Sequence, residues 1–114
     1  SQLGGLLDIE CGLLHIFLKH TSASLLIQEN ADPTARHDLE KFFETLVPEN
    51  QSWMTHTQEG ADDSPSHIRS ALTQPALTIP IANGKLDLGT WQGIYLFEHR
   101  DQSHVRNLTL TVYH

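Results

Sequence analysis

The chain has 114 residues, of which 39% are hydrophobic and 18% are charged, and this composition is typical of one globular domain. Seven basic against fourteen acidic residues give a net charge of −7, which argues against nucleic acid or an anionic membrane as a partner. The one cysteine, Cys11, allows no internal disulfide, so we expect a cytoplasmic protein. No stretch approaches the roughly 20 apolar residues of a membrane-spanning helix.

The first half of the chain predicts two strands followed by one helix. Residues 12–19 form an apolar run bounded by a glycine and a polar turn, which indicates a buried strand, and residues 25–27 indicate a second strand. Asp32 is a favoured N-cap, and Pro33 suits the first position of a helix. Pro48 ends this helix, and its apolar residues at helical spacing predict a face that packs in the core: Leu39, Phe42, Phe43 and Leu46.

The second half predicts a long loop, a short helix and several strands. Residues 49–66 are polar and irregular, and a short helix is expected over residues 66–72 with Ser66 as its cap. Strands are expected over residues 77–81, 85–88, 94–99 and 107–113, with a hairpin turn at Asn83-Gly84. We therefore expect residues 1–114 to form a single α+β domain, β-rich and antiparallel, like a β-sandwich with one main helix.

The polar stretch from His56 to His67 holds two histidines and three carboxylates within twelve residues. Its two histidines could join His20, at the end of the first strand, in a three-nitrogen metal site with an open fourth position. Zinc is the metal that this ligand set favours. The spacing matches no standard zinc motif, and a solvated surface loop would have a similar composition.

The same stretch holds three carboxylates that could act on a substrate or hold a cation. Glu59 and Asp62 are candidate catalytic groups, and their oxygen atoms would also suit magnesium next to a substrate phosphate. Asp63 is a candidate substrate-binding residue, and it could equally cap the following helix or form its turn.

Polar residues at strand ends complete the predicted site. Glu98 is a third candidate catalytic carboxylate, because it lies in an otherwise apolar strand and must be paired or exposed. Three further residues are expected to bind a small-molecule substrate: Ser22, Asn30 and Gln92.

Four separated blocks of the chain resemble the YjbQ family, from about residue 10 to the end. They are His20-Thr21-Ser22-Ala23-Ser24-Leu25, Glu29-Asn30-x-Asp32-Pro33, His56-x-x-Glu59-Gly60-Ala61-Asp62-Asp63-x-Pro65-Ser66-His67-Ile68 and Gly89-Thr90-Trp91-Gln92-Gly93-Ile94. The order of the blocks and the intervals between them also match, which makes the resemblance specific.

The resemblance implies a compact β-rich domain that assembles as a homotrimer, with a metal at His20, His56 and His67. It also implies strand-forming residues ahead of the present first residue, and a secondary thiamine-phosphate synthase activity. That reaction joins a hydroxymethylpyrimidine diphosphate to a thiazole phosphate and releases pyrophosphate. Two alternatives stay open at this point. One is a metal-assisted hydrolase of a small metabolite, and the other is a non-catalytic protein that binds a metal or metabolite.

Overall fold

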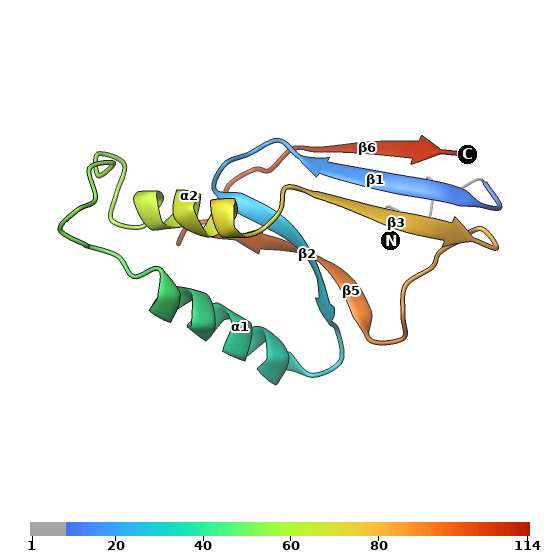
Figure 1. Ribbon diagram of the computed structural model, residues 1–114, viewed down its shortest axis with the longest axis horizontal. Helices are drawn as coiled ribbons and strands as arrows, with labels where there is room; N and C mark the ends of the chain where they lie inside the picture. Colours follow the sequence, from blue (N-terminus) through green and yellow to red (C-terminus); the bar gives the residue numbers. More distant parts are fainter. Residues whose placement is uncertain (1–8) are drawn as a thin grey trace.

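Two antiparallel sheets form the body of the molecule in this computed structural model, which describes residues 9–114. The larger sheet has the strand order β4-β3-β1-β6, and the smaller one pairs β2 with β5. Their bounds are β1 Gly12–Leu18, β2 Ala23–Glu29, β3 Ala76–Ala82, β4 Lys85–Leu86, β5 Gln92–Glu98 and β6 Leu108–Tyr113. The β-rich antiparallel α+β fold expected from the sequence is thus confirmed (Figure 1). The strand expected ahead of the first residue lies outside the described residues.

The core lies beneath the inner face of the larger sheet, where alternate residues of each strand point the same way. Leu14 pairs with Ile79 of β3 and Val112 of β6, so apolar side chains of three strands meet on one face. The buried cluster comprises Leu14, Ile16, Leu18, Ala23, Leu25, Leu77, Ile79 and Ile81. Burial of these side chains explains the register, because a shift by one residue would turn them to solvent.

Local signals place the turns and one helix end as the sequence predicts. The side chain of Asp32 accepts a hydrogen bond from the backbone N–H of Thr34, and helix α1 runs Pro33–Leu46. Asn83 and Gly84 both have positive φ, as the hairpin between β3 and β4 requires. Pro80 is accommodated because its neighbour on one side is only the two-residue strand β4.

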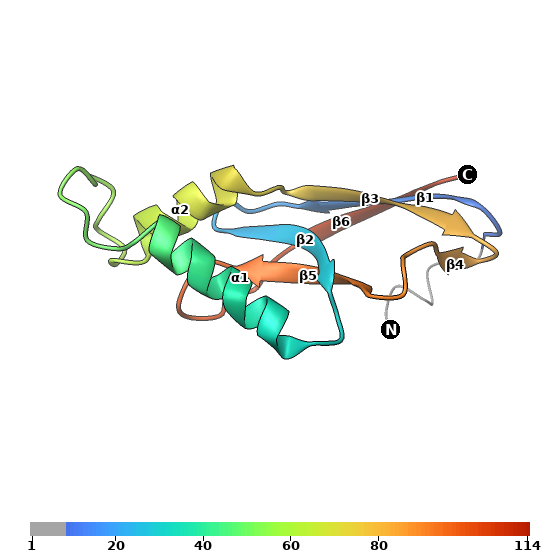
Figure 2. The same ribbon diagram turned by 60° about the horizontal axis from the view of Figure 1, so that its bottom comes forward.

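The prediction that one face of α1 packs in the core is wrong, because no residue of this helix is buried. Phe42 is 57% exposed and Leu46 is 54% exposed. The helix lies along the smaller sheet and apart from the larger one (Figure 2). The apolar spacing does form one face of the helix, and on that face the ring of Phe43 packs against Phe97 of β5, with ring centres 5.5 Å apart.

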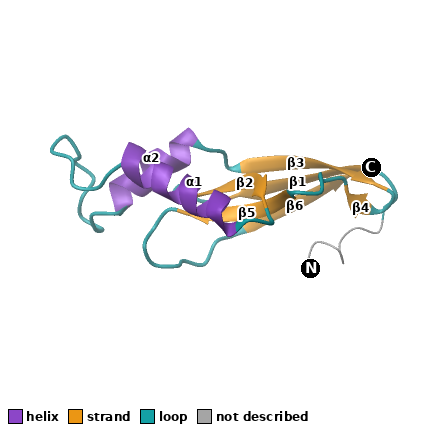
Figure 3. Ribbon diagram, turned by 90° about the horizontal axis from the view of Figure 1, so that it is seen from below, coloured by secondary structure: helices purple, strands orange, loops and turns teal. Residues whose placement is uncertain are grey.

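The second helix begins earlier than the sequence predicts. Helix α2 runs Asp63–Leu72 and packs beside β2. Ser66 is therefore an interior residue of the helix and not its cap, and its hydroxyl donates to the carbonyl of Asp63 at 2.5 Å. Both helices gather at one end of an elongated molecule, and the larger sheet extends to the other end (Figure 3).

Candidate functional site

Asp63 is the centre of the candidate site, at the first residue of α2. Only 1% of this residue is exposed. His56 Nε2 lies 2.7 Å from one carboxylate oxygen, Oδ2, and His67 Nε2 lies 3.2 Å from the other, Oδ1. Asp63 and His67 are four residues apart in the helix, which places the two side chains on one face. His56 comes from the preceding loop, and its ring centre lies 5.2 Å from that of His67.

This cluster has the chemistry of a metal-ligand set. One ligand atom from each of His56, Asp63 and His67 lies within 4.8 Å of the other two. Asp63 Oδ2 is buried and makes no hydrogen bond among the described residues, although His56 Nε2 lies 2.7 Å from it. Buried oxygens are almost always satisfied. Two imidazoles and one carboxylate with an open side are also a typical set of ligands for catalytic zinc.

A hydrogen bond to a backbone carbonyl determines which ring nitrogen of His67 faces the cluster. His67 Nδ1 lies 2.8 Å from the carbonyl oxygen of Thr21 and must donate its hydrogen there, since a carbonyl can only accept. In the neutral ring, Nε2 then carries a lone pair and faces the Asp63 carboxylate. Two acceptors at this distance repel each other unless a proton or a cation lies between them. A second group that orients a ligating histidine in this way is typical of metal sites.

Arg100 fixes both neighbouring aspartates from the far side of the cluster. Its Nη1 donates to Asp63 and its Nε donates to Asp62, each at 2.9 Å, and its Nη2 donates to the carbonyl of Glu59 at 3.0 Å. The hydrogen bond from Arg100 holds the pKa of Asp62 below its ordinary value. Burial alone would raise the pKa of Asp63, but a side-chain hydrogen bond with Glu59, followed by the nearby charges of His67, Arg100 and His56, lowers it on balance. Both carboxylates are therefore ionised near neutral pH.

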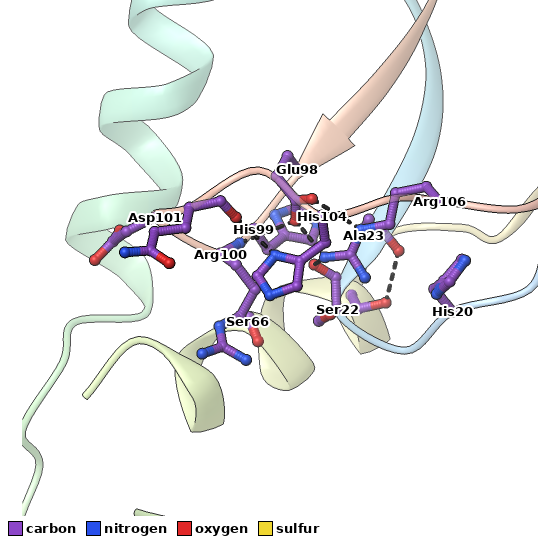
Figure 4. A network of polar contacts seen from close by, with 12 residues as sticks. His20, Ser22, Ala23, Ser66, Glu98, His99, Arg100, Asp101, His104 and Arg106 are labelled. Atoms are coloured by element: carbon purple, nitrogen blue, oxygen red, sulfur yellow. Dashed lines mark hydrogen bonds and ion pairs between the residues drawn. The ribbon is translucent and has the colours of Figure 1, made fainter. Parts of the chain in front are cut away.

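A second ion pair lies beside the first, between Glu98 and Arg106. Arg106 Nε donates to Glu98 at 2.8 Å, and Arg106 Nη2 also reaches the carbonyl oxygen of Ser22 at 3.3 Å (Figure 4). Burial would raise the pKa of Glu98, but the hydrogen bond from Arg106 outweighs it and the pKa is lowered. Glu98 is thus half-buried and paired, which is one of the two states that its sequence context allows.

Two surface hollows meet at His67. One, of about 400 Å³, is lined by His56, Ser64, His67, Ile68, Ala71 and Leu72. The other, of about 370 Å³, is lined by His20, Thr21, His67, Ser70, Ala71, Thr73 and Pro75. A small molecule in either hollow would therefore lie beside His67.

The structure brings together only some of the predicted site residues. His56 and His67 meet, but Asp63 takes the place that the sequence suggests for His20. His20 Nε2 accepts a hydrogen bond from the backbone N–H of Asn107 at 2.6 Å, and it does not belong to the cluster. Asp62 is tied to Arg100, and the part of Glu59 that contacts Arg100 is its backbone carbonyl.

Three predicted substrate-binding residues do not contact the cluster: Asn30, Gln92 and Ser22. Asn30 donates to the carbonyl of Gln92 at 3.2 Å, at the opposite end of the β2–β5 pair from Glu98. The six residue steps of strand from Gln92 to Glu98 span about 20 Å, so Asn30 and Gln92 are not brought to the histidines. Ser22 is buried and offers its carbonyl oxygen to Arg106 and His99.

Sequence reasoning missed the two arginines and assigned Asp63 a different role. The i, i+4 spacing of Asp63 and His67 was a usable signal, but a helix start at Ser66 leaves Asp63 outside the helix. Arg100 and Arg106 lie in the loop between β5 and β6. Nothing local indicates that Arg100 pairs with carboxylates 37 and 38 positions earlier.

Fold and site together define a small two-sheet α+β protein with a histidine–carboxylate cluster at the start of its second helix. The chain belongs to the YjbQ family, because the family model described as "UPF0047 protein YjbQ-like" matches residues 6–114. Within the described residues, no helix is long and apolar enough to cross a membrane.

Curated relatives and solved structures agree with this family. The chain is 54% identical over 104 residues to UPF0047 protein sll1880 of Synechocystis, covering 91% of this chain and 71% of that protein. It is 47% identical over 112 residues to UPF0047 protein YjbQ of Escherichia coli O157:H7, covering 98% and 80%. A conserved hypothetical protein of Thermus thermophilus has a similar structure, with a TM-score of 0.86 at 33% identity, covering 97% of this chain and 85% of that one. These names state no activity.

Proposed function

We propose that this protein is a divalent-metal enzyme that acts on a small phosphorylated metabolite, with His56, Asp63 and His67 as the metal ligands. The observation that carries the proposal is the convergence of their three ligand atoms within 4.8 Å, one of them from a buried carboxylate whose Oδ2 makes no hydrogen bond among the described residues and lies 2.7 Å from His56 Nε2. Zinc suits this mixture of nitrogen and oxygen donors, and magnesium is the alternative where a substrate phosphate supplies further oxygens.

The charges around the cluster support a phosphorylated substrate held through a cation. Both nearby arginines are already paired, Arg100 with Asp62 and Asp63 and Arg106 with Glu98. Neither of these two guanidinium groups is therefore free to bind a diphosphate beside the cluster. A bound divalent cation would supply the charge neutralisation that a departing pyrophosphate needs. The chain's own residues hold the ligands in place: Arg100 orients Asp63, and Thr21 orients His67.

The specific reaction that we propose is thiamine-phosphate synthesis. In this reaction a nitrogen of the thiazole phosphate forms a bond to the methylene carbon of the pyrimidine diphosphate, and the carbon–oxygen bond to pyrophosphate breaks. The two hollows that meet at His67 offer places for two substrates. Metal-assisted hydrolysis is the competing use of the same cluster, with water in place of the thiazole.

Metal analysis tests the cluster directly. We expect the purified protein to hold one zinc or other transition metal per chain, and His56→Ala, His67→Ala and Asp63→Asn to lose it. His37→Ala is the matched control, because His37 is an exposed histidine of α1 outside the cluster. Full metal retention in the three cluster variants, or no metal binding after zinc is added back to the unmodified protein, would refute the proposed site.

Product analysis then tests the reaction. The metal-loaded protein is incubated with both substrates, and thiamine phosphate and pyrophosphate are measured in equal amounts if the synthase proposal holds. Release of phosphate from the pyrimidine diphosphate alone would instead identify a hydrolase. A metal-loaded protein that turns over neither would be a non-catalytic binding protein.

A further inference from the structure

His20 borders the candidate site without belonging to the cluster, and its hydrogen bonding defines what it can do. Its Nε2 lies 2.6 Å from the backbone nitrogen of Asn107. A backbone N–H can only donate, so Nε2 must be the acceptor and carry the lone pair. The neutral ring therefore has its hydrogen on Nδ1. No protein partner is recorded for that nitrogen among the described residues.

The hollow beside His20 is suited to a negatively charged group. Its seven lining residues include no carboxylate, although the whole chain has a net charge of −7. Two other polar groups of the hollow already donate to backbone carbonyls, Ser70 to Ala23 at 3.0 Å and Thr73 to Arg69 at 2.9 Å. His67 also donates its Nδ1 hydrogen, to Thr21. The donors of this hollow for which no acceptor is found among the described residues are His20 Nδ1–H and the hydroxyl of Thr21, and of the two the His20 N–H is on a ring fixed by its bond with Asn107.

The position of the hollow connects this donor to the cluster. His67 lines the hollow, and its Nε2 lies 3.2 Å from Asp63 Oδ1. A molecule in the hollow would thus lie beside the ligands proposed above and could contact both a cation there and His20. Figure 4 shows His20 on the side of the polar network where the chain enters β2, beside Ser22 and Arg106.

We propose that His20 is a substrate-binding residue and not a metal ligand, and that its Nδ1–H donates to an anionic phosphate oxygen of the substrate. The inference rests on the proposed function for the identity of the substrate, but the donor itself rests on the contact with Asn107. A fixed donor aimed at one phosphate oxygen would select phosphorylated compounds and position them against the cluster.

Two amide substitutions separate the two nitrogens of His20. His20→Asn places an amide N–H near the position of Nδ1, and His20→Gln places its amide near the position of Nε2. Pyrophosphate is the probe, and its affinity is measured by calorimetry with zinc-loaded protein. We expect His20→Gln to weaken pyrophosphate binding about tenfold or more, the usual effect of losing a hydrogen bond to a charged group. His20→Asn should stay within about threefold of the unmodified protein, and zinc content should be unchanged in both variants.

Nitrogen-15 NMR of histidine-labelled protein provides the independent readout. We expect the His20 ring in the Nδ1–H form, with its Nδ1 resonance shifted when pyrophosphate is added. Loss of zinc in both variants would overturn the proposal by making His20 a ligand. An Nε2–H ring, or equal pyrophosphate affinity in His20→Gln and the unmodified protein, would overturn it too. A different result is that neither the unmodified protein nor the variants bind zinc, while His20→Gln still weakens pyrophosphate binding. In that case the metal proposal fails and the His20 proposal stands.

Discussion

His99 is a buried histidine whose neutral form stabilises the fold. It is 2% exposed, its Nε2 lies 2.9 Å from the hydroxyl of Ser24, and its Nδ1 has no recorded partner among the described residues. Burial lowers the pKa of His99 to about 4, and the positive charges of Arg69 and Arg106 add to this effect against the opposing charge of Glu98. The imidazole therefore stays neutral in the folded protein at pH values where it is protonated in the unfolded chain.

This pKa predicts that the protein loses stability between about pH 6.5 and pH 4. In that window the unfolded state binds more protons than the folded state, so the free energy of unfolding falls as pH falls. Above about pH 6.5 neither state is protonated at this residue and the contribution is complete. The full loss is up to about 3 kcal/mol.

Urea unfolding at half-unit pH steps measures this effect. His99→Gln keeps an amide near Nε2 for Ser24 but does not titrate, so its free energy of unfolding should depend less on pH than that of the unmodified protein. His37→Gln is the control, because His37 is exposed on α1. Equal pH dependence in His99→Gln and the unmodified protein would show that His99 is not the group responsible.

Arg100 is not a proposed metal ligand, but its replacement should lower the free energy of unfolding strongly. Its side chain is 17% exposed and serves two carboxylates, one of them almost fully buried. Removing one partner of a buried pair leaves the other charge uncompensated, so Arg100→Gln should lower the free energy of unfolding by about 2 to 4 kcal/mol.

Zinc provides the check on this variant. A cation bound at Asp63 would stabilise the folded state by mass action and restore part of the loss. Thermal unfolding of Arg100→Gln is therefore measured with and without excess zinc, next to Arg36→Gln, which removes an exposed pair with Glu40. A loss no larger than that of Arg36→Gln would contradict the structural role of Arg100.

At the level of elements, helix α1 depends on its own end signals more than on packing. None of its residues is buried, and Asp32 Oδ1 accepts from both the backbone N–H and the hydroxyl of Thr34. Replacing an N-cap residue by alanine costs about 1 kcal/mol. Asp32→Ala should therefore speed hydrogen exchange of α1 amides roughly fivefold, with little change in β1 and β3. Asp38→Ala, in the middle of the helix, is the control, and equal exchange in the two variants would argue against the cap.

The same elements show what local sequence can and cannot predict. The Asp32–Pro33 helix start and the Asn83–Gly84 turn are local signals, and each is found where expected. Strand β6 also forms where expected, but its burial does not alternate, and Leu108 is 46% exposed. The apolar spacing of α1 correctly predicts a helix, but spacing cannot say what that face contacts. The cluster at Asp63 depends on where α2 begins and on a long-range pair with Arg100, and neither is fixed by a short motif.

The whole molecule is more extended than a compact chain of its length. Its radius of gyration is 16.2 Å, against about 13 Å for a globular domain of this size. Several large apolar side chains are exposed as well: Phe17, Phe42, Leu46, Leu72, Leu96 and Tyr113. Exposed apolar side chains mark an interaction site where they form one contiguous patch. We propose that these side chains are covered by self-association, and the homotrimer expected from the sequence stays a prediction.

Light scattering on purified protein tests this assembly. We expect a mass three times the 12.8 kDa of one chain. Phe42 is 57% exposed on the apolar side of α1, so Phe42→Glu would bury a charge in any interface that covers this helix and should shift the mass toward that of a monomer. His37→Glu, on the opposite side of α1, adds the same charge and should leave the mass unchanged. A trimer that survives Phe42→Glu would show that the interface lies elsewhere, and a monomeric unmodified protein would reject the trimer.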